Sequence, residues 1–229
     1  MTHPAFQLHT QALDEHGLRL VVQGHDGVAI ASAVLHARIG LELPRFWYHV
    51  GQVVHAAQEL KLFRAQRTLL LGNDLTGLAE LGDFVAADAT PAELRTAWTL
   101  LAQGALHHIR QQPGHWGAGL IVELPGLRDD SGRSPFWQGL TRHFYRGDAH
   151  DAAARLGPDW RTHLAALLPR QLVYASFLPE AAQRAIGAHE ASAETLHAAL
   201  QAAGLRWRGH IRIDDGGAVL EARADDPQA

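Results

Sequence analysis

The chain has 229 residues, of which 47 % are hydrophobic and 19 % charged, with a formal net charge of -4 and a sequence pI ≈ 6.4. This composition is typical of a globular protein with one sizeable core, and it excludes a disordered chain and a general attraction to nucleic acid or anionic membranes. The absence of cysteine excludes disulfides, thiolate catalysis and cysteine-ligated zinc.

The N-terminal part of the chain predicts antiparallel strands. Its short apolar runs are rich in Val, Ile and Leu, and the sequence Gly24-His25-Asp26-Gly27 between two of them is a strong hairpin signal. We expect strands at 6–13, 18–22, 28–35, 46–50, 68–71 and 80–85. The last two flank a loop at 72–77.

The clearest helix begins after Thr90. Thr90 is an expected N-cap, Pro91 suits the first helical position, and Glu93 completes a capping box. Apolar residues then recur at helical spacing until Pro113 ends the helix. A buried-type strand at 118–124 follows, so the order strand, helix, strand predicts a crossover unit.

The remainder of the chain predicts helices at 134–144, 158–168, 179–186 and 193–203, followed by strands at 206–213 and 218–222. The fold class is therefore α+β, with a mixed, mostly antiparallel central sheet flanked by helices. We expect a single domain over 1–229, with N-terminal strands at 1–45, a core at 46–145 and C-terminal helices and strands at 146–229.

Three blocks, at 46–60, 66–81 and 129–144, resemble the arginine N-succinyltransferase family and occur in the family's order. The resemblance implies an acyl-CoA N-acyltransferase-like fold of the GCN5-related type. It also implies transfer of a succinyl group from succinyl-CoA to the α-amine of arginine in arginine catabolism, with ornithine as a second candidate amine. Succinyl-CoA is then a cosubstrate, and no tightly bound cofactor is expected.

The chemistry implied by this resemblance needs a base for the attacking amine and donors for the developing oxyanion. Glu80 is the candidate base, because it lies where the central strand of this fold often carries a carboxylate. The alternatives are a solvated glutamate at a strand end, or Glu123 as the base.

Six further residues are candidates for substrate binding. Asn73 and Asp74 either form a turn or receive the cationic end of arginine. Ser131, Arg133 and Ser134 precede a helix, where they either hold a carboxylate or serve as an N-cap and a surface arginine. The sixth candidate, His49, lies within the first block.

No metal site is predicted, because the 16 histidines are scattered and none forms an H-E-x-x-H pair. A start without a cationic segment and a chain without a long apolar run indicate a cytoplasmic protein.

Two features depart from the family pattern. Only about 45 residues precede Phe46, so a wall of the acceptor site is expected to be missing or to come from another chain. The segment 86–91 has no Arg, Lys or Gly where the family's coenzyme A loop lies, and Asp88 would repel a pyrophosphate.

These departures leave two functions open. One is an acyltransferase that acts by itself, and the other is a non-catalytic homologue that pairs with an active subunit. Some members of the family work as two related subunits, so a homo- or hetero-oligomer is expected.

Overall fold

The computed structural model describes residues 2–3 and 6–225 and contains one eleven-stranded sheet. The order of its strands in space is β1-β2-β3-β4-β7-β8-β11-β10-β5-β6-β9. The strands are β1 (Thr2–His3), β2 (Phe6–Ala12), β3 (Gly17–Gly24), β4 (Ala29–His36), β5 (Trp47–Ala57), β6 (Leu62–Gly72), β7 (Ala79–Ala86), β8 (Gly119–Glu123), β9 (Val173–Tyr174), β10 (Arg206–Arg212) and β11 (Ala218–Arg223).

The α-helices are α1 (Pro91–Gln111), α2 (Pro113–Trp116), α3 (Pro135–Gly139), α4 (Ala149–Leu156), α5 (Trp160–Ala165), α6 (Glu180–Ala185) and α7 (Glu194–Ala202). Three short 3-10 turns are η1 (Thr141–His143), η2 (Ala175–Phe177) and η3 (Ala191–Ala193). Among the described residues, no helix is both long enough and apolar enough to cross a membrane.

The sheet is mixed and mostly antiparallel, which confirms the predicted fold class. Its parallel pair is β7 and β8, and α1 is the crossover between them. The capping box at the start of α1 is also confirmed, because Thr90 accepts from the backbone N–H of Glu93 while the Glu93 carboxylate accepts from Thr90. Pro91 occupies the first turn, as expected.

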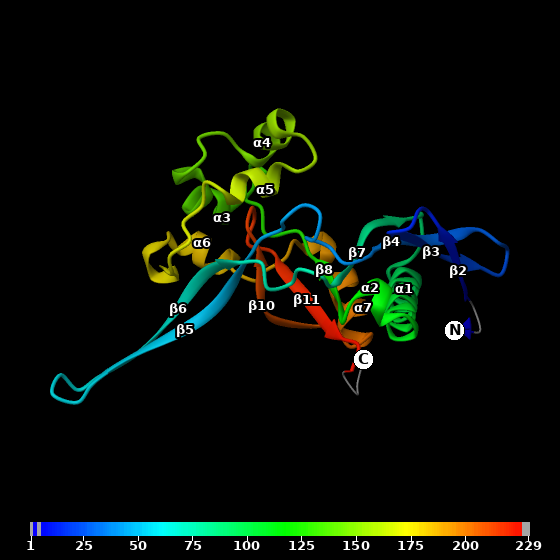
Figure 1. Cartoon of the computed structure of the whole chain (residues 1–229), viewed down its shortest axis with the longest axis horizontal. Helices are drawn as coiled ribbons and strands as arrows, with labels where there is room; N and C mark the ends of the chain where they lie inside the picture. The colour runs from blue at the N-terminus through cyan, green and yellow to red at the C-terminus, as the bar shows by residue number, and fades with distance from the viewer. Residues whose placement is uncertain (1, 4–5, 226–229) are drawn as a thin grey trace.

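Two helical groups cover different halves of the sheet (Figure 1). Helices α1 and α7 pack side by side against the half that contains β2, β3, β4, β7 and β8, burying Leu101 and Leu200. Helices α3 to α6 form a second core with β5, β6 and β10, around Tyr48, Phe136 and Trp137. A smaller cluster that includes Trp47 and Ile121 lies on the opposite face of the sheet, because these residues alternate along their strands with Tyr48 and Leu120 of the two larger cores.

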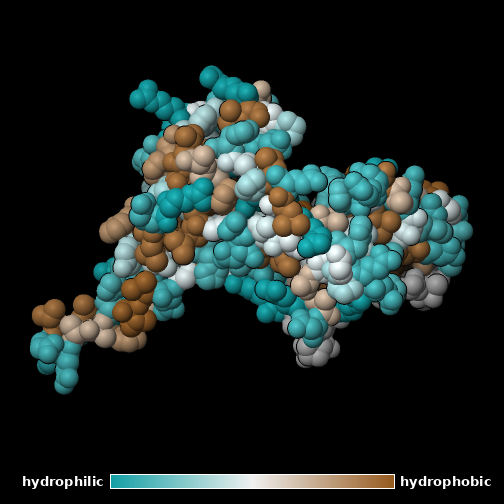
Figure 2. Space-filling model, viewed as in Figure 1, coloured by the Kyte–Doolittle hydropathy of each residue, from teal (hydrophilic) through white to brown (hydrophobic). Residues whose placement is uncertain are grey.

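Strands β5 and β6 form a long two-stranded ribbon that extends away from the body of the molecule (Figures 1 and 2). They pair continuously from Trp47 with Gly72 to Ala57 with Leu62. The strands predicted at 46–50 and 68–71 are only the body-side ends of this ribbon. The outer half carries His, Gln and Arg side chains on both faces and therefore lacks the alternation that predicts a half-buried strand.

The other differences from the sequence predictions concern short helices. The helix expected at 134–144 ends at Gly139 and continues only as η1, and the helix expected at 158–168 is limited to α5. Helix α4 was not predicted, although Asp148 caps it by accepting from the N–H of Asp151. Short elements of this kind are stabilised by the core that they share, which a local pattern does not reveal.

Candidate functional site

Strands β7 and β8 are parallel neighbours that separate after their first residues. Their ladder consists of Ala79 with Leu120 and Glu80 with Ile121. Beyond these pairs β7 continues beside β4 and β8 continues beside β11. A crossover pair that separates in this way leaves an opening within the sheet.

One backbone feature holds these strands together at their start, and another separates them further along. At the start of the strands, Gly117 has φ +105° and an added Cβ would lie 2.2 Å from the carbonyl oxygen of Gly77, so the two entry turns are in close contact. Further along, β7 has an extra residue opposite β4 near Asp83, which has φ 52°. A β-bulge bends its strand, so β7 turns away from β8 where the bulge occurs.

A cavity of about 810 Å³ lies at this opening. Its floor includes Glu80 and Glu123 from the two separating strands, and the segment that connects β4 to β5 forms one wall. The charged and titratable side chains that line it are His16, His36, Arg38, Glu42, Arg45, Glu80, Asp83, Glu123, Asp159, Arg161 and Arg212. Both signs of charge therefore face the same space, which suits a zwitterionic ligand better than a simple anion.

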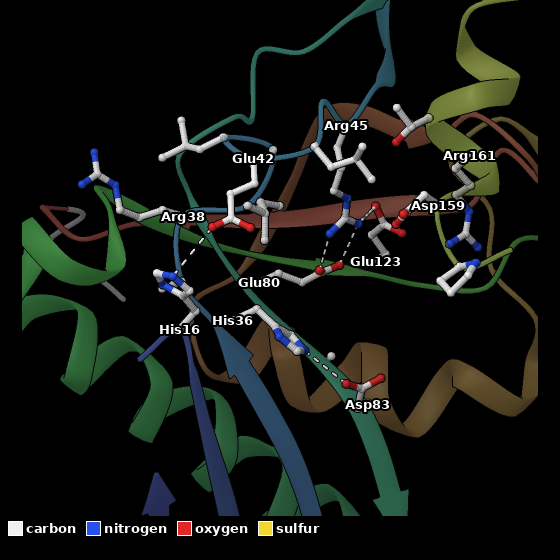
Figure 3. A pocket seen from close by; sticks show the side chains of 18 of the residues that line it. His16, His36, Arg38, Glu42, Arg45, Glu80, Asp83, Glu123, Asp159 and Arg161 are labelled. Atoms are coloured by element: carbon white, nitrogen blue, oxygen red, sulfur yellow. Dashed lines mark hydrogen bonds and ion pairs between the residues drawn. The ribbon is translucent and has the colours of Figure 1, made fainter. Parts of the chain in front are cut away.

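Arg45 joins the two carboxylates at the centre of the cavity (Figure 3). Its guanidinium donates to both oxygens of Glu80, one of them at 3.0 Å, and to Oε1 of Glu123 at 2.9 Å. The indole N–H of Trp47 donates to the same Glu123 oxygen at 2.7 Å. Burial raises the pKa of Glu123, but Arg45, Arg212 and Arg161 outweigh that effect and keep its pKa below the ordinary value.

A second set of ion pairs extends from this cluster. Arg212 contacts Asp214 at 3.0 Å and Asp215 at 3.1 Å, and Arg161 contacts Asp214 at 3.0 Å. Burial raises the pKa of Asp214, yet the two arginines hold it well below its usual range. Burial and the adjacent Asp214 charge instead raise the pKa of Asp215.

The N-terminus of α1 is occupied by its own capping groups. Thr90 and Glu93 satisfy each other's backbone donors, and Pro91 has no N–H to offer. Because Glu93 also places a negative charge in the first turn, this helix end is poorly suited to a diphosphate.

Asp74 and His49 lie in a separate cluster around His210, which pairs with His49 across β5 and β10. The Nε2 atom of His210 is 3.4 Å from Asp74, its Nδ1 atom is 2.7 Å from Glu221, and its ring centroid is 5.0 Å from that of His49. Burial lowers the pKa of His210, but the two carboxylates reverse this and raise it overall. Asn73 forms a turn, its carbonyl accepting from the N–H of Thr76.

The candidates Ser131, Arg133 and Ser134, which precede α3, form a third location. Ser134 accepts from the N–H of Trp137 and is therefore the N-cap that the sequence left open as an alternative. Arg133 is exposed, and its Nε donates a hydrogen bond to the Ser131 hydroxyl. That hydroxyl in turn donates to the Asp129 carboxylate. Arg133 and Ser134 line a small cavity of about 140 Å³ with Asp214 and Asp215.

The structure thus brings Glu80 and Glu123 together but distributes the other candidates elsewhere. None of His49, Asn73, Asp74, Ser131, Arg133 and Ser134 is among the described residues that line the larger cavity. Their roles in substrate binding stay predictions.

The protein-family model described as arginine N-succinyltransferase beta subunit matches residues 1–229 of this chain. The chain belongs to this family. The arginine N-succinyltransferase subunit beta of Pseudomonas aeruginosa is 34 % identical over 206 residues, covering 90 % of this chain. The arginine N-succinyltransferase of Yersinia enterocolitica is 29 % identical over 219 residues, covering 95 % of this chain.

The structural comparison agrees with the predicted acyltransferase fold. The structure of arginine/ornithine succinyltransferase subunit AI from Pseudomonas aeruginosa matches with a TM-score of 0.69 at 23 % identity, over 93 % of this chain. The chain spans 60 %, 63 % and 62 % of the length of these three relatives, respectively.

The sequence did not identify Arg45, Arg161 and Arg212 as parts of the site. Arg45 directly precedes the first family block, and Arg212 lies in the strand before the turn Asp214-Asp215-Gly216-Gly217. The one sequence feature that could have indicated Arg212 is its charge within a run that otherwise predicts a strand. The partners of Arg45 and Arg161 lie far away in sequence, so only the fold reveals these ion pairs, whereas Arg212 pairs with Asp214 and Asp215 in the turn that follows it.

Proposed function

We propose that this chain is a subunit of an arginine N-succinyltransferase, which transfers a succinyl group from succinyl-CoA to the α-amine of arginine. The observation that carries the proposal is the cavity between β7 and β8, with Glu80 and Glu123 on its floor, in a member of this family. Ornithine is a second amine of the same chemical class, since it has the same α-amino acid end.

The charge pattern of the cavity supports an amino acid as the acceptor. Arg161 lines the cavity with its side chain 41 % exposed, so it can meet an α-carboxylate. Glu42 and Asp83 are exposed carboxylates on the same cavity and can meet a guanidinium. Arg45 already shows that this site accommodates a guanidinium between two carboxylates.

In the proposed reaction the uncharged α-amine attacks the thioester carbonyl carbon of succinyl-CoA. The new C–N bond forms, the C–S bond breaks, and the coenzyme A sulfur leaves as a thiol after taking up a proton. Glu80 accepts the amine proton through a water molecule, because its two oxygens already accept from Arg45. Glu123 is less suitable, since Trp47 and Arg45 both donate to one of its oxygens and its pKa is lowered.

A second candidate function is favoured by one observation, the occupied N-terminus of α1. The capping box of Thr90 and Glu93 leaves few donors for a coenzyme A diphosphate at this helix end. The chain would then act as a non-catalytic subunit, and a related chain would hold succinyl-CoA.

Both functions involve a partner subunit, and the β5–β6 ribbon is the surface we propose for it. Leu60, Leu62 and Phe63 near its tip are 75 %, 45 % and 76 % exposed, and Figure 2 shows hydrophobic side chains along the projecting ribbon. Exposed apolar side chains on a protruding hairpin are typical of an interface. Two relatives have the word subunit in their names.

Calorimetric titration of succinyl-CoA and of arginine into the purified chain separates the two functions. Submillimolar binding of both ligands supports a catalytic subunit that holds both substrates. Binding of arginine without succinyl-CoA favours the non-catalytic subunit, and no binding of either ligand refutes the proposed site.

The role of Glu80 is tested with Glu80→Gln, using the exposed Glu180→Gln as the matched control. If Glu80 is the base, turnover falls at least about 100-fold while arginine affinity stays nearly constant. Unchanged turnover in Glu80→Gln removes this residue from the role.

The ribbon is tested by light scattering of the double variant Leu60→Ser/Phe63→Ser. The control is Val28→Ser, an exposed valine in the turn between β3 and β4. Loss of an oligomer only in the ribbon variant supports the interface, and an unchanged mass refutes it.

A further inference from the structure

Two imidazoles and one carboxylate come together at the start of α7. None of the three lines the cavity that contains Glu80 and Glu123. They are His189, Glu194 and His197, and their ligand atoms all lie within 4.8 Å of one another. We propose that these three side chains form a binding site for a divalent transition metal ion of the zinc type. The sequence predicted no metal site, because the histidines are scattered along it and none forms an H-E-x-x-H pair.

The local backbone explains the meeting of these side chains. Glu194 and His197 lie three residues apart in the first turn of α7, so they share one face of the helix. His189 comes from the segment between α6 and η3, and its Nε2 atom is 3.0 Å from Oε2 of Glu194. The rings of His189 and His197 are 4.3 Å apart at their centroids.

The geometry lies close to that of a coordinated ion. Two ligand atoms on a tetrahedral zinc ion, each at about 2.1 Å, are about 3.4 Å apart. The ligand atoms here lie within 4.8 Å of one another, which is at most about 1.4 Å more than this spacing. Glu194 is 69 % exposed and can rotate to close the gap, whereas His189 is 17 % exposed and is held in place.

The neighbouring segment supports this arrangement. The N–H of Gly187 donates to Gly216, and that of Glu190 donates to Pro125, so the backbone around His189 is fixed to the body of the protein. The Glu190 carboxylate pairs with Arg128 at 3.0 Å and therefore does not compete with Glu194. A bound ion would join this segment to α7, and solvent would supply its fourth ligand.

The choice of metal follows from the ligands. Two imidazole nitrogens and one carboxylate oxygen match the ligand set of zinc sites that keep one open position, and copper or nickel also favour imidazole. Calcium and magnesium prefer oxygen ligands and are not expected to bind here. The alternative is a Glu194–His189 ion pair at a helix start that binds no metal.

The test uses tag-free protein treated with EDTA and then dialysed. We expect calorimetry with zinc chloride to give one saturable site, and we expect zinc to raise the melting temperature in a manner that EDTA reverses. Cobalt(II) provides an independent readout, because tetrahedral coordination gives strong visible absorption that zinc displaces. Absence of saturable binding with 100 μM zinc, as an order-of-magnitude ceiling for a specific site, overturns the proposal.

The variants His189→Gln and His197→Gln each locate the site. Each is expected to weaken zinc affinity at least tenfold, whereas the control His107→Gln/His108→Gln, an imidazole pair whose centroids are 6.1 Å apart, leaves it unchanged. Retained affinity in both site variants refutes the assignment. If a variant does not fold, the cobalt(II) spectrum of the unmodified chain decides the question.

Discussion

Removal of the Arg45 guanidinium is the sharpest test of the cluster in the cavity. Arg45→Met keeps most of the apolar stem but leaves Glu80 and Glu123 without their shared cation. The side chains of these two glutamates are only 15 % and 12 % exposed, so water solvates their charges poorly. Breaking a buried ion pair by removing one partner costs about 3–5 kcal/mol.

We expect the lower end of that range, about 3 kcal/mol, because Arg45 itself is 28 % exposed and water can enter the space that it leaves. For a domain of this size such a loss corresponds to a fall in melting temperature of about 6–12 °C. Urea unfolding followed by circular dichroism measures the free energy of unfolding, and the slope with urea should stay constant.

Two comparisons make this measurement specific. Arg45→Met/Glu80→Gln should be more stable than Arg45→Met, because the second change removes an unpaired charge. Arg133→Met is the matched control, since Arg133 is 63 % exposed and its ion pair with Asp129 contributes at most about 0.5 kcal/mol. An Arg45→Met variant within about 1 kcal/mol of the wild type would contradict the view that the arginine holds the two carboxylates.

Three further predictions concern the strands and helix around the cavity and the cluster around His210. Gly117→Ala should destabilise the fold by about 3 kcal/mol, because alanine is strained at φ +105° and its Cβ would meet the carbonyl of Gly77. Thermal unfolding measures this loss. An unchanged melting temperature would show that the two entry turns are not in contact. Thr90→Ala should cost about 1 kcal/mol in urea unfolding, since it removes the side-chain half of the capping box; a neutral result would mean that α1 begins elsewhere. The raised pKa of His210 implies a contribution to stability that is complete below the unfolded pKa of about 6.5 and disappears as the pH rises through the folded value. NMR titration of His210 should show this raised pKa and a lower value in Asp74→Asn, and equal values in both proteins would remove Asp74 as a cause.

Much of the fold could be predicted from local patterns. Strands β2 to β4, the helix that begins after Thr90, and the strand that follows this helix have periodicity, turn or capping residues that depend on near neighbours in sequence. The outer half of the β5–β6 ribbon could not be predicted in this way, because both of its faces are largely exposed and no alternation marks a buried side.

For the candidate site, the sequence by itself determined the family, Glu80 and Glu123 as the two carboxylates to consider, and the capping of α1 beside the expected coenzyme A loop. Each of these depends on residues that are adjacent in the chain or match a contiguous block. Only the tertiary structure decided that Arg45 joins the two carboxylates and that His189 meets Glu194 and His197. The physical reason is that ion pairs and ligand sets depend on distances in space, and these are set by the separation of β7 from β8 and by the packing of a loop against α7.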